Sequence, residues 1–420
     1  MANQELNRET AGIQDGNEAG IRSVILYEMP RSWLQYDPLK LVNELTSAKA
    51  AVMSLTTIPY QREWAKELEK IQLKREVAGT SKIEGADFTD RELDIALKEN
   101  PDELLTRSQK QAHAAVQTYR WIAKLEDDRP INIELIREVH RRIVTGADDD
   151  HCEPGAIRGH DQNVTFGVPR HRGCSGGRDC QKAFEDLMNA VGTQFRGHDP
   201  LIQALALHYH FAAMHPFQDG NGRTARAVEA LMLQRAGLRD SLFIAMSNFY
   251  YDEKSDYLKA LSAVRASNYD LTPFIRFGLV GIATQCQRLF IEIRTQVSKA
   301  LFRNVMFDLF NRLESTRKRV IKERQIEILK LFLKTETMEL PQIIRAALPH
   351  YKGLKDAHKA VIRDLNSLLH IRALELQVSG DQGKRYDLTI RLEWATEITE
   401  TDFFERLRSL PKAKTYALLQ

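Results

Sequence analysis

The 420-residue sequence has little cysteine, little net charge and no long apolar run, and each shortage excludes a class of protein. Its 4 cysteines form no Cys-x₂-Cys pair, which argues against a disulfide scaffold and against a zinc module. A formal net charge of +3 gives the whole chain no attraction to nucleic acid or to a membrane surface. No apolar run approaches membrane-spanning length, and the polar first residues lack the apolar core of a signal peptide. We therefore expect a soluble cytoplasmic protein of two to four domains.

The most informative stretch is His215-Pro-Phe-Gln-Asp-Gly-Asn-Gly-Arg223. Upstream, Asp199 and a proline open a helical pattern, and Pro216 predicts that the helix ends at the preceding histidine, which then faces a loop. After the glycines, residues 224–236 are predicted to form a second helix. The loop therefore brings unpaired backbone N–H groups and a helix N-terminus to one point, where a phosphate binds well.

The side chains of this loop suit nucleotide chemistry. His215 titrates near neutral pH and can accept a proton from an incoming hydroxyl group. Asp219 offers the hard oxygen ligand that Mg²⁺ prefers. Arg223 and Arg226 lie on the same side of the second helix and can hold phosphate oxygens bidentately. A plain surface turn and part of a calcium loop are the alternatives, but arginine at 223 stands where a calcium loop needs an oxygen ligand.

Residues 215 to 226 resemble the Fic family signature, His-x-Phe-x-(Asp/Glu)-Gly-Asn-Gly-Arg-x-x-Arg, at every fixed position. The resemblance implies a helical core that transfers AMP from ATP to a Ser, Thr or Tyr hydroxyl of a target protein and releases pyrophosphate. It implies that Phe217 anchors the loop and that Asp219 holds Mg²⁺. The implied catalytic residues are His215, Asp219 and Arg223. The implied nucleotide-binding residues of the loop are Gly220, Asn221, Gly222, Arg223 and Arg226. Glycine at 222, where related phosphotransferases carry lysine, favours nucleotidyl transfer.

A second pattern lies far upstream, in the run from Thr80 to Gly85. Thr80 and Glu84 are four residues apart, so they share one face of a helix, and Gly85 is a natural helix stop. A capping box at residues 89–92 begins the next helix, so we expect a separate short helix here. The run resembles the family's inhibitory pattern, which implies that Glu84 pairs with Arg226 and restrains AMP transfer. An ordinary exposed glutamate is the alternative.

Residues 154–180 are polar and rich in glycine. The family carries a β-hairpin flap at this place, which pairs with the backbone of the target. The residues that resemble its first strand are Val164, Thr165, Phe166 and Gly167. Cys152, Cys174 and Cys180 lie in or beside this region, and we expect free thiols in a mobile loop, with a metal site as the weaker alternative.

Tyrosine residues follow the signature helix. Tyr257 lies where the family places the first residue of an aromatic pair, although Leu258 replaces the second, and the resemblance implies that Tyr250, Tyr251 or Tyr257 stacks on adenine. Buried structural tyrosines explain them equally well. His208 and His210 lie in an apolar helix and are interpreted as core or capping residues.

The predicted fold class is mainly α: a helical Fic core with a small β-hairpin flap, an N-terminal helical domain and a C-terminal winged-helix domain. The predicted boundaries are 1–36 for a disordered or irregular N-terminus, 37–107 for the helical domain with its inhibitory helix, 108–316 for the core, 317–395 for the winged helix and 396–420 for a tail.

The winged-helix prediction depends on three helical patterns followed by two extended runs joined by a glycine-containing turn. The basic residues that could contact DNA phosphates are Lys355, His358, Lys359, Arg363, Lys384 and Arg385. A solvated basic face on a protein-interaction module explains them equally well.

Two functions follow from these patterns. The first is a protein adenylyltransferase that uses ATP and Mg²⁺, modifies a target protein or itself, and is restrained by Glu84. The second is a nucleotide-sensing regulator that binds DNA through the winged helix. Neither function involves a membrane, and the resemblance allows a homodimer.

Overall fold

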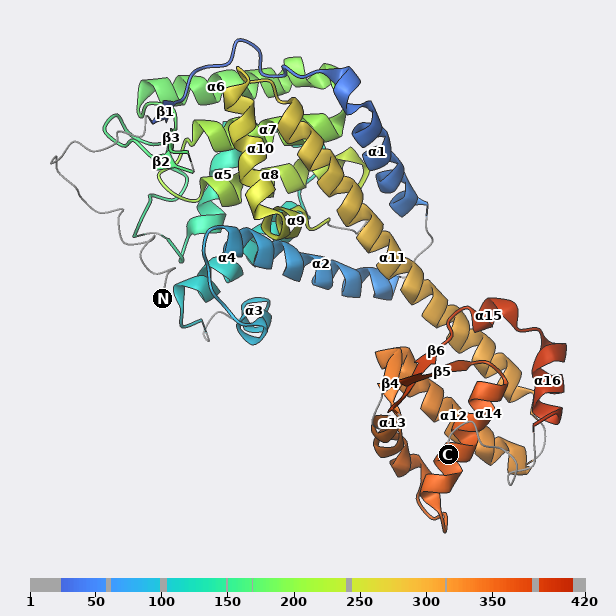
Figure 1. Cartoon of the computed structure of the whole chain (residues 1–420). Helices are drawn as coiled ribbons and strands as arrows, with labels where there is room; N and C mark the ends of the chain where they lie inside the picture. Colours follow the sequence, from blue (N-terminus) through green and yellow to red (C-terminus); the bar gives the residue numbers. More distant parts are fainter. Residues whose placement is uncertain are drawn as a thin grey trace. The chain divides into compact units, whose positions relative to one another are not determined.

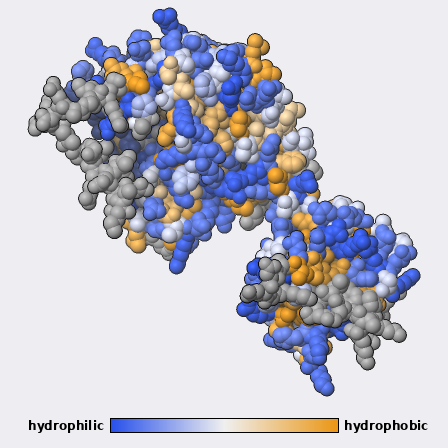
Figure 2. Space-filling view, viewed as in Figure 1, coloured by the Kyte–Doolittle hydropathy of each residue, from blue (hydrophilic) through white to orange (hydrophobic). Residues whose placement is uncertain are grey.

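The computed structural model describes residues 24–57, 62–98, 104–148, 150–167, 169–238, 244–313, 316–379 and 385–410, without side chains for 62–67, 238, 316–321 and 379. They divide into two compact units, Met1–Phe290 and Ile291–Gln420. Among the described residues, no helix combines the length and the hydropathy that a membrane crossing requires. On the face shown in Figure 2, polar residues cover most of both units, and apolar ones lie in small groups among them.

The first unit is built mainly of helices (Figure 1). They are α1 (Val42–Thr56), α2 (Arg62–Ile83), α3 (Asp90–Ala96), α4 (Arg107–Ile122), α5 (Ile133–Val144), α6 (Arg178–Gly192), α7 (Pro200–Met214), α8 (Asn221–Leu233), α9 (Met246–Asp252), α10 (Lys254–Ala266) and the first part of α11 (Thr272–Asn311). A small sheet has the order β1-β3-β2, with β1 (Ile25–Leu26) parallel to β3 (His171–Arg172) and β2 (Thr165–Phe166) antiparallel to it.

Helix α7 forms the centre of the first unit. The Asp199 carboxylate accepts a hydrogen bond from the backbone of Leu201, and Pro200 occupies the first turn, as the sequence predicts. Nearly every side chain of α7 is buried, because α6 and α8 cover its sides. The helix ends at His215, whose φ of 56° lies in the left-handed region. The chain then turns directly into α8.

The inhibitory segment is separate from the next helix, α3, as expected, but it is not short, since α2 runs unbroken for 22 residues and ends just before Glu84. Residues 24–36 are irregular apart from β1, yet they pack on the first unit: β1 joins the sheet, and Trp33 and Leu34 are buried. Trp33 offers its carbonyl oxygen to His210 Nε2 at 2.7 Å. The prediction for residues 1–23 lies outside the described residues, and all of 37–107 belongs to the same unit as the core.

The second unit has the element order helix, strand, helix, helix, strand, strand. Its elements are α12 (Thr316–Thr335), β4 (Thr337–Glu339), α13 (Leu340–Ala347), α14 (Ala357–His370), β5 (Leu374–Ser379), β6 (Arg385–Ile390), α15 (Trp394–Glu397) and α16 (Glu400–Arg408). The sheet order is β4-β6-β5, with both pairings antiparallel. The sequence predicts the three helices and the two long strands but misses β4. The winged-helix assignment itself stays a prediction.

The core of this unit reaches beyond the predicted limits of 317–395. Phe302 and Phe310, from the second half of α11, pack against Trp394 and Phe403 at ring distances of 5.1 and 5.3 Å. Phe403 belongs to α16 and is completely buried, so the predicted tail is part of the fold up to α16. These four aromatic side chains bury a large apolar area, which explains why the unit needs both flanking segments.

Candidate active site

The loop between α7 and α8 is held in shape by its own side chains. The Asn221 amide accepts a hydrogen bond from Phe217 N at 2.9 Å and donates one to Phe217 O at 2.8 Å. The Phe217 ring is fully buried and stacks on His140 at 3.7 Å. Asn221 therefore shapes the loop through its side chain, and Phe217 is the anchor that the resemblance implies.

Gly220 begins α8 in a conformation that only glycine adopts without strain. Its φ is 73°, and a Cβ at this position would overlap Val144. The first N–H groups of α8 have no acceptor within the helix. Together with the helix dipole, they make the turn at Gly220 a point that attracts anions.

His215 is held as a neutral base. Its Nδ1 lies 3.0 Å from the Ala212 carbonyl oxygen, and because a carbonyl only accepts, Nδ1 carries the proton. The other ring nitrogen, Nε2, then has a free lone pair. Burial lowers the pKa of His215 to about 4, and the neighbouring Arg158 acts in the same direction. The Phe166 ring stacks on the imidazole at 4.0 Å and 13° and fixes its plane.

A carboxylate that sequence reasoning missed organises the acidic side of the site. Asp148 is completely buried and lies 2.5 Å from Arg223 NH1 and 2.5 Å from Arg107 NH2. Burial alone would raise the pKa of Asp148. The charge of Arg223 and the hydrogen bonds that Asp148 accepts from Arg223 and Arg107 hold that pKa below the ordinary value. Asp219 Oδ2 lies 3.7 Å from Arg223 and 3.8 Å from Arg107. No local motif marks Asp148, since its partners lie far away in the sequence.

Arg226 is occupied by the end of α2. It donates from Nε to Thr80 Oγ1 at 2.9 Å and from NH2 to Glu84 Oε1 at 2.5 Å. Arg226 is 2% exposed and Glu84 38% exposed, so the pair lies at the edge of the buried site. Burial works to raise the pKa of Glu84, but Arg226 outweighs it and the pKa is lowered. Gly85, with a φ of 88°, turns the chain away. The structure thus brings together the pair that the resemblance implies.

Helix α2 is fastened to the core by a second buried carboxylate that the sequence did not reveal. Glu76 is 1% exposed and accepts hydrogen bonds from Tyr119 Oη at 2.8 Å, from Ser247 N at 2.8 Å and from Ser247 Oγ. One turn further on, a Cβ at Gly79 would overlap the backbone of Ser247 and Asn248. Helix α2 therefore lies in backbone contact with α9, and only glycine allows this approach.

Tyr250 and Tyr257 are buried side chains with partners of their own. Tyr250 is completely buried and donates to Glu229 Oε1 at 2.9 Å, and Tyr257 Oη lies 2.9 Å from His208 Nε2. His208 Nδ1 in turn contacts Glu229. This geometry favours structural tyrosines over the adenine-stacking alternative, and it agrees with core roles for the two histidines.

The predicted flap is a short hairpin. Thr165 pairs with Arg172 and Phe166 with His171, while Val164 precedes the strand and Gly167 turns the chain with a φ of 75°. The neighbouring thiols Cys152, Cys174 and Cys180 are free, as expected, and they are buried; Cys180 belongs to α6 and not to a loop. Within the described part of the chain, no group of three or more His, Cys, Asp or Glu side chains could hold a metal ion by itself.

In the second unit, several of the basic side chains predicted to face DNA already have acidic partners. Lys359 pairs with Asp356 at 2.9 Å, Arg363 with Asp364 at 3.4 Å and Arg385 with Glu339 at 2.7 Å. Lys384 lies outside the described residues. These ion pairs reduce the positive charge of the face and give the DNA-binding alternative no support.

Comparison with known proteins finds a family match within the first unit. Residues 130–233, which include α5 to α8 and the loop between α7 and α8, match the model of the Fic/DOC family. This part of the chain is therefore similar to a Fic domain, and its helices agree with the mainly helical fold that the resemblance implies.

Two curated relatives extend this identification. The chain is 31% identical over 158 residues to protein adenylyltransferase Fic of Nematostella vectensis, a match that covers 36% of this chain and 33% of that protein. It is 29% identical over 171 residues to protein adenylyltransferase fic-1 of Caenorhabditis elegans, covering 41% of this chain and 31% of that protein. The chain thus spans about a third of the length of these relatives.

Solved structures share the fold. A Fic family protein from Desulfovibrio desulfuricans G20 has a TM-score of 0.52 at 17% identity, covering 86% of this chain and 98% of that one. A Fic-1 fragment from Caenorhabditis elegans has a TM-score of 0.51 at 20% identity, covering 62% of this chain and 75% of that one. At such low sequence identity, these structural similarities support the fold alone.

Proposed function

We propose that the protein is an adenylyltransferase that transfers AMP from ATP to a hydroxyl group of a target protein or of itself, and that Glu84 restrains it. The observation that carries this proposal is the convergence of a neutral base, His215 Nε2, with a helix N-terminus and two arginines. Proton abstraction and phosphate binding are the two tasks that such a transfer requires.

In the proposed reaction, the hydroxyl oxygen of the target bonds to the α-phosphorus of ATP, and the bond from that phosphorus to the bridging oxygen of the β-phosphate breaks. His215 Nε2 takes the hydroxyl proton, and pyrophosphate leaves. The N–H groups at the start of α8 and the guanidinium groups of Arg223 and Arg226 hold the phosphate oxygens as negative charge moves onto the leaving group.

Asp219 fits the role of a magnesium ligand. Its side chain is 41% exposed, and Oδ1 accepts a hydrogen bond from Gly220 N at 2.6 Å, which orients the carboxylate. Mg²⁺ is commonly held by one or two carboxylates with phosphate oxygens and water, so a single aspartate beside a phosphate site is sufficient. The ion would neutralise charge on the phosphate oxygens.

The restraint by Glu84 is electrostatic and steric. While Glu84 and Thr80 occupy Arg226, this guanidinium has less capacity for phosphate oxygens. The Glu84 carboxylate also brings a negative charge to the start of α8, where it repels a polyphosphate. ATP would therefore bind weakly or in an unproductive pose until Glu84 withdraws.

The test is AMP transfer from labelled ATP, followed by mass spectrometry of the protein itself and of a cell lysate. Replacing Glu84 with alanine should raise incorporation by about tenfold or more, because Arg226 is then available to the phosphate oxygens. Glu69→Ala, an exposed glutamate on the same helix, is the matched control and should leave incorporation unchanged. His215→Ala in the Glu84→Ala background should abolish it. Equal labelling by wild type and Glu84→Ala would remove the restraint, and labelling without His215 would remove the proposed base.

A further inference from the structure

Arg158 is a buried arginine that has no carboxylate as a partner. It is 2% exposed, and no described aspartate or glutamate forms an ion pair with it. Its guanidinium donates instead to the carbonyl oxygens of His215, Gln162 and Cys174, at 2.7, 2.6 and 2.5 Å. A buried cation that lacks a compensating negative charge is strongly destabilising. The groups whose negative charge acts on Arg158 are the thiols of Cys174 and Cys180.

These two thiols lie against the guanidinium and against each other. Arg158 NH2 lies 3.9 Å from Cys180 Sγ, and the Cys180 thiol donates a hydrogen bond to the Cys174 sulfur. This hydrogen bond lowers the pKa of Cys174, Arg158 acts in the same direction, and burial opposes both. The same hydrogen bond and burial raise the pKa of Cys180. Cys174 is therefore the sulfur that carries negative charge more readily, and Cys180 is the one that keeps its proton.

The glycines between the two cysteines bring them together. Gly177 turns the chain with a φ of 78°, and a Cβ at Gly176 would overlap the carbonyl oxygen of Gly159. Cys180 then falls in the first turn of α6, where the helix dipole favours a negative charge nearby. Cys174 is 6% exposed and Cys180 0%, so a small oxidant from solvent meets Cys174 first.

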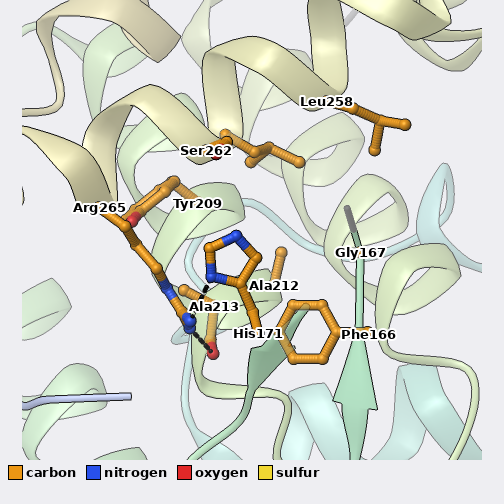
Figure 3. Close-up of a pocket in the computed structure, with 10 residues that line it drawn as sticks. Phe166, Gly167, His171, Tyr209, Ala212, Ala213, Leu258, Ser262 and Arg265 are labelled. Carbon is orange, nitrogen blue, oxygen red and sulfur yellow. Dashed lines mark hydrogen bonds between the residues drawn. The ribbon is translucent and has the colours of Figure 1, made fainter. Parts of the chain in front are cut away.

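The same group of side chains holds the backbone of the turn that carries His215. Three consecutive carbonyl oxygens accept hydrogen bonds from it: Met214 O from Cys174 N at 2.9 Å, His215 O from Arg158 Nε at 2.7 Å and Pro216 O from Cys180 Sγ at 3.8 Å. On the other side, Arg265 NH2 donates to Ala213 O at 2.8 Å (Figure 3). The single thiol proton of Cys180 serves either Pro216 O or the Cys174 sulfur, so a chemical change at the two sulfurs reaches the turn directly.

We propose that Cys174 and Cys180 are a site of reversible oxidation: a hydroperoxide joins them in a disulfide bond, which displaces the turn that carries His215 and slows AMP transfer until a thiol reductant opens the bond. The disulfide itself is independent of the proposed function. Its effect on AMP transfer rests on that function and adds a mode of regulation to it.

The oxidation proceeds in two balanced steps. First, the Cys174 thiolate sulfur attacks one oxygen of hydrogen peroxide, the O–O bond breaks, and the departing hydroxide takes up a proton to become water. This leaves a sulfenic acid on Cys174. Second, the Cys180 sulfur attacks the Cys174 sulfur, the S–O bond breaks, and the departing oxygen leaves as water with the proton of Cys180. The two thiols together lose two electrons, and the peroxide is reduced to water.

The new bond changes both the geometry and the charge beside the turn. A disulfide holds its sulfur atoms about 2.05 Å apart, closer than a hydrogen bond between thiols does. It removes the thiol proton that Cys180 offers to Pro216 O, and it removes the negative charge beside Arg158. A displacement of about 1 Å in an active site can slow a reaction by about 100-fold, so we expect a loss of at least about tenfold.

The first experiment maps the disulfide in the full-length Glu84→Ala protein. The reduced protein is treated with hydrogen peroxide, digested with trypsin without reductant and analysed by mass spectrometry. Trypsin cuts after Arg178, between the two cysteines, so a disulfide appears as a link between peptides 173–178 and 179–182. Cys286, which is buried in α11, is the internal control and should stay reduced. If the two peptides are not linked, the inference is overturned.

The second experiment measures AMP transfer before peroxide, after peroxide and after dithiothreitol. The Glu84→Ala protein should lose at least about tenfold in rate and recover it with the reductant. Cys174→Ala in the same background should keep its own starting rate after peroxide, whereas the matched control Cys286→Ala should show the full loss and recovery. In Cys180→Ala, dimedone should label the sulfenic acid of Cys174. Thermal midpoints report that each variant is folded, and the peptide map of the Glu84→Ala protein decides the disulfide without any cysteine variant.

The outcomes separate this inference from the function on which part of it rests. Linked peptides with an unchanged rate overturn the effect on the turn, and so does a loss that Cys174→Ala retains or that dithiothreitol does not reverse. If the reduced Glu84→Ala protein transfers no AMP at all, the proposed function fails. The effect on the turn is then measured by nitrogen-15 NMR of the His215 ring, whose signals should shift with peroxide and return with the reductant. Unmoved signals overturn it.

Discussion

The carboxylate of Glu84 lies where a side chain at position 222 would stand. A Cβ at Gly222 would overlap Glu84 Oε1 and come within 3.1 Å of Arg226 NH1. Glycine at this position therefore lets the inhibitory carboxylate approach the backbone at the start of α8, in addition to leaving room for a phosphate. In the proposed function, the absence of a side chain at Gly222 thus serves both the phosphate site and its restraint by Glu84.

Gly222→Ala should consequently cost more stability when Glu84 is present than when it is absent. In the wild type the new methyl group displaces the carboxylate from Arg226, whereas in Glu84→Ala it meets only the end of the Arg226 side chain, at 3.1 Å. We expect a coupling of about 1 kcal/mol in a double-mutant cycle, measured by urea unfolding of the four proteins. Equal costs in both backgrounds would mean that the carboxylate moves aside freely.

His215 should remain uncharged in the free protein well below neutral pH. Burial lowers its pKa to about 4, so the imidazole is the neutral base above that value and becomes protonated only as the pH falls through it. Nitrogen-15 NMR of the histidine rings between pH 3 and pH 8 tests this. His160 is an internal control, because its hydrogen bond to Asp161 raises its pKa. A His215 midpoint near the ordinary value of about 6.5 would contradict the burial argument.

Removal of Asp148 should destabilise the first unit. Arg223 and Asp148 are 2% and 0% exposed, so Asp148→Ala leaves a buried guanidinium without its main partner. Such a change costs about 3–5 kcal/mol. Chemical denaturation should show this loss, together with weaker ATP binding. Asp150→Ala, at a side chain that is 76% exposed, is the control and should stay within about 0.5 kcal/mol of the wild type. Similar stabilities of the two variants would argue that Arg223 finds another partner.

Glu76 should give the first unit a pH-dependent stability. Burial raises its pKa from 4.5 to about 7, so the folded protein binds a proton more tightly than the unfolded chain does. The stability from this group is complete below about pH 4.5 and is lost as the pH rises through about 7, by on the order of 3 kcal/mol. Urea unfolding at several pH values measures the slope. Glu76→Gln cannot titrate and should show a flatter profile between pH 5 and pH 8, and an equally steep one would assign the effect to another group.

The parts of the site that the sequence predicts are those in which neighbouring residues act together. The loop from His215 to Arg226 is contiguous, and its helix ends follow from Asp199, Pro216 and the glycines. The four-residue spacing of Thr80 and Glu84 is equally local, and the structure brings both to Arg226.

The parts that the sequence misses depend on tertiary contacts. Asp148 and Glu76 are ordinary acidic residues until folding buries them beside arginine, tyrosine and serine side chains. The sequence predicts too short a helix for α2. Gly85 indicates where this helix stops, but no capping residue or proline indicates where it begins. From the sequence, Tyr250 could equally be a buried core residue or a residue that contacts the nucleotide. Its hydrogen bond to Glu229 in the structure favours the core role.

If Glu84 restrains the protein as proposed, the backbone contact at Gly79 limits how that carboxylate can withdraw. At that glycine and one turn upstream, α2 is held against α9 by the backbone contact and by the hydrogen bonds of Glu76 to Ser247. Downstream, only a few residues separate this contact from Glu84, which already lies beyond the last helical residue, Ile83. Under the proposed restraint, withdrawal of Glu84 would therefore require only the last turn of α2 to unwind, which exposes less buried surface than removal of the whole helix.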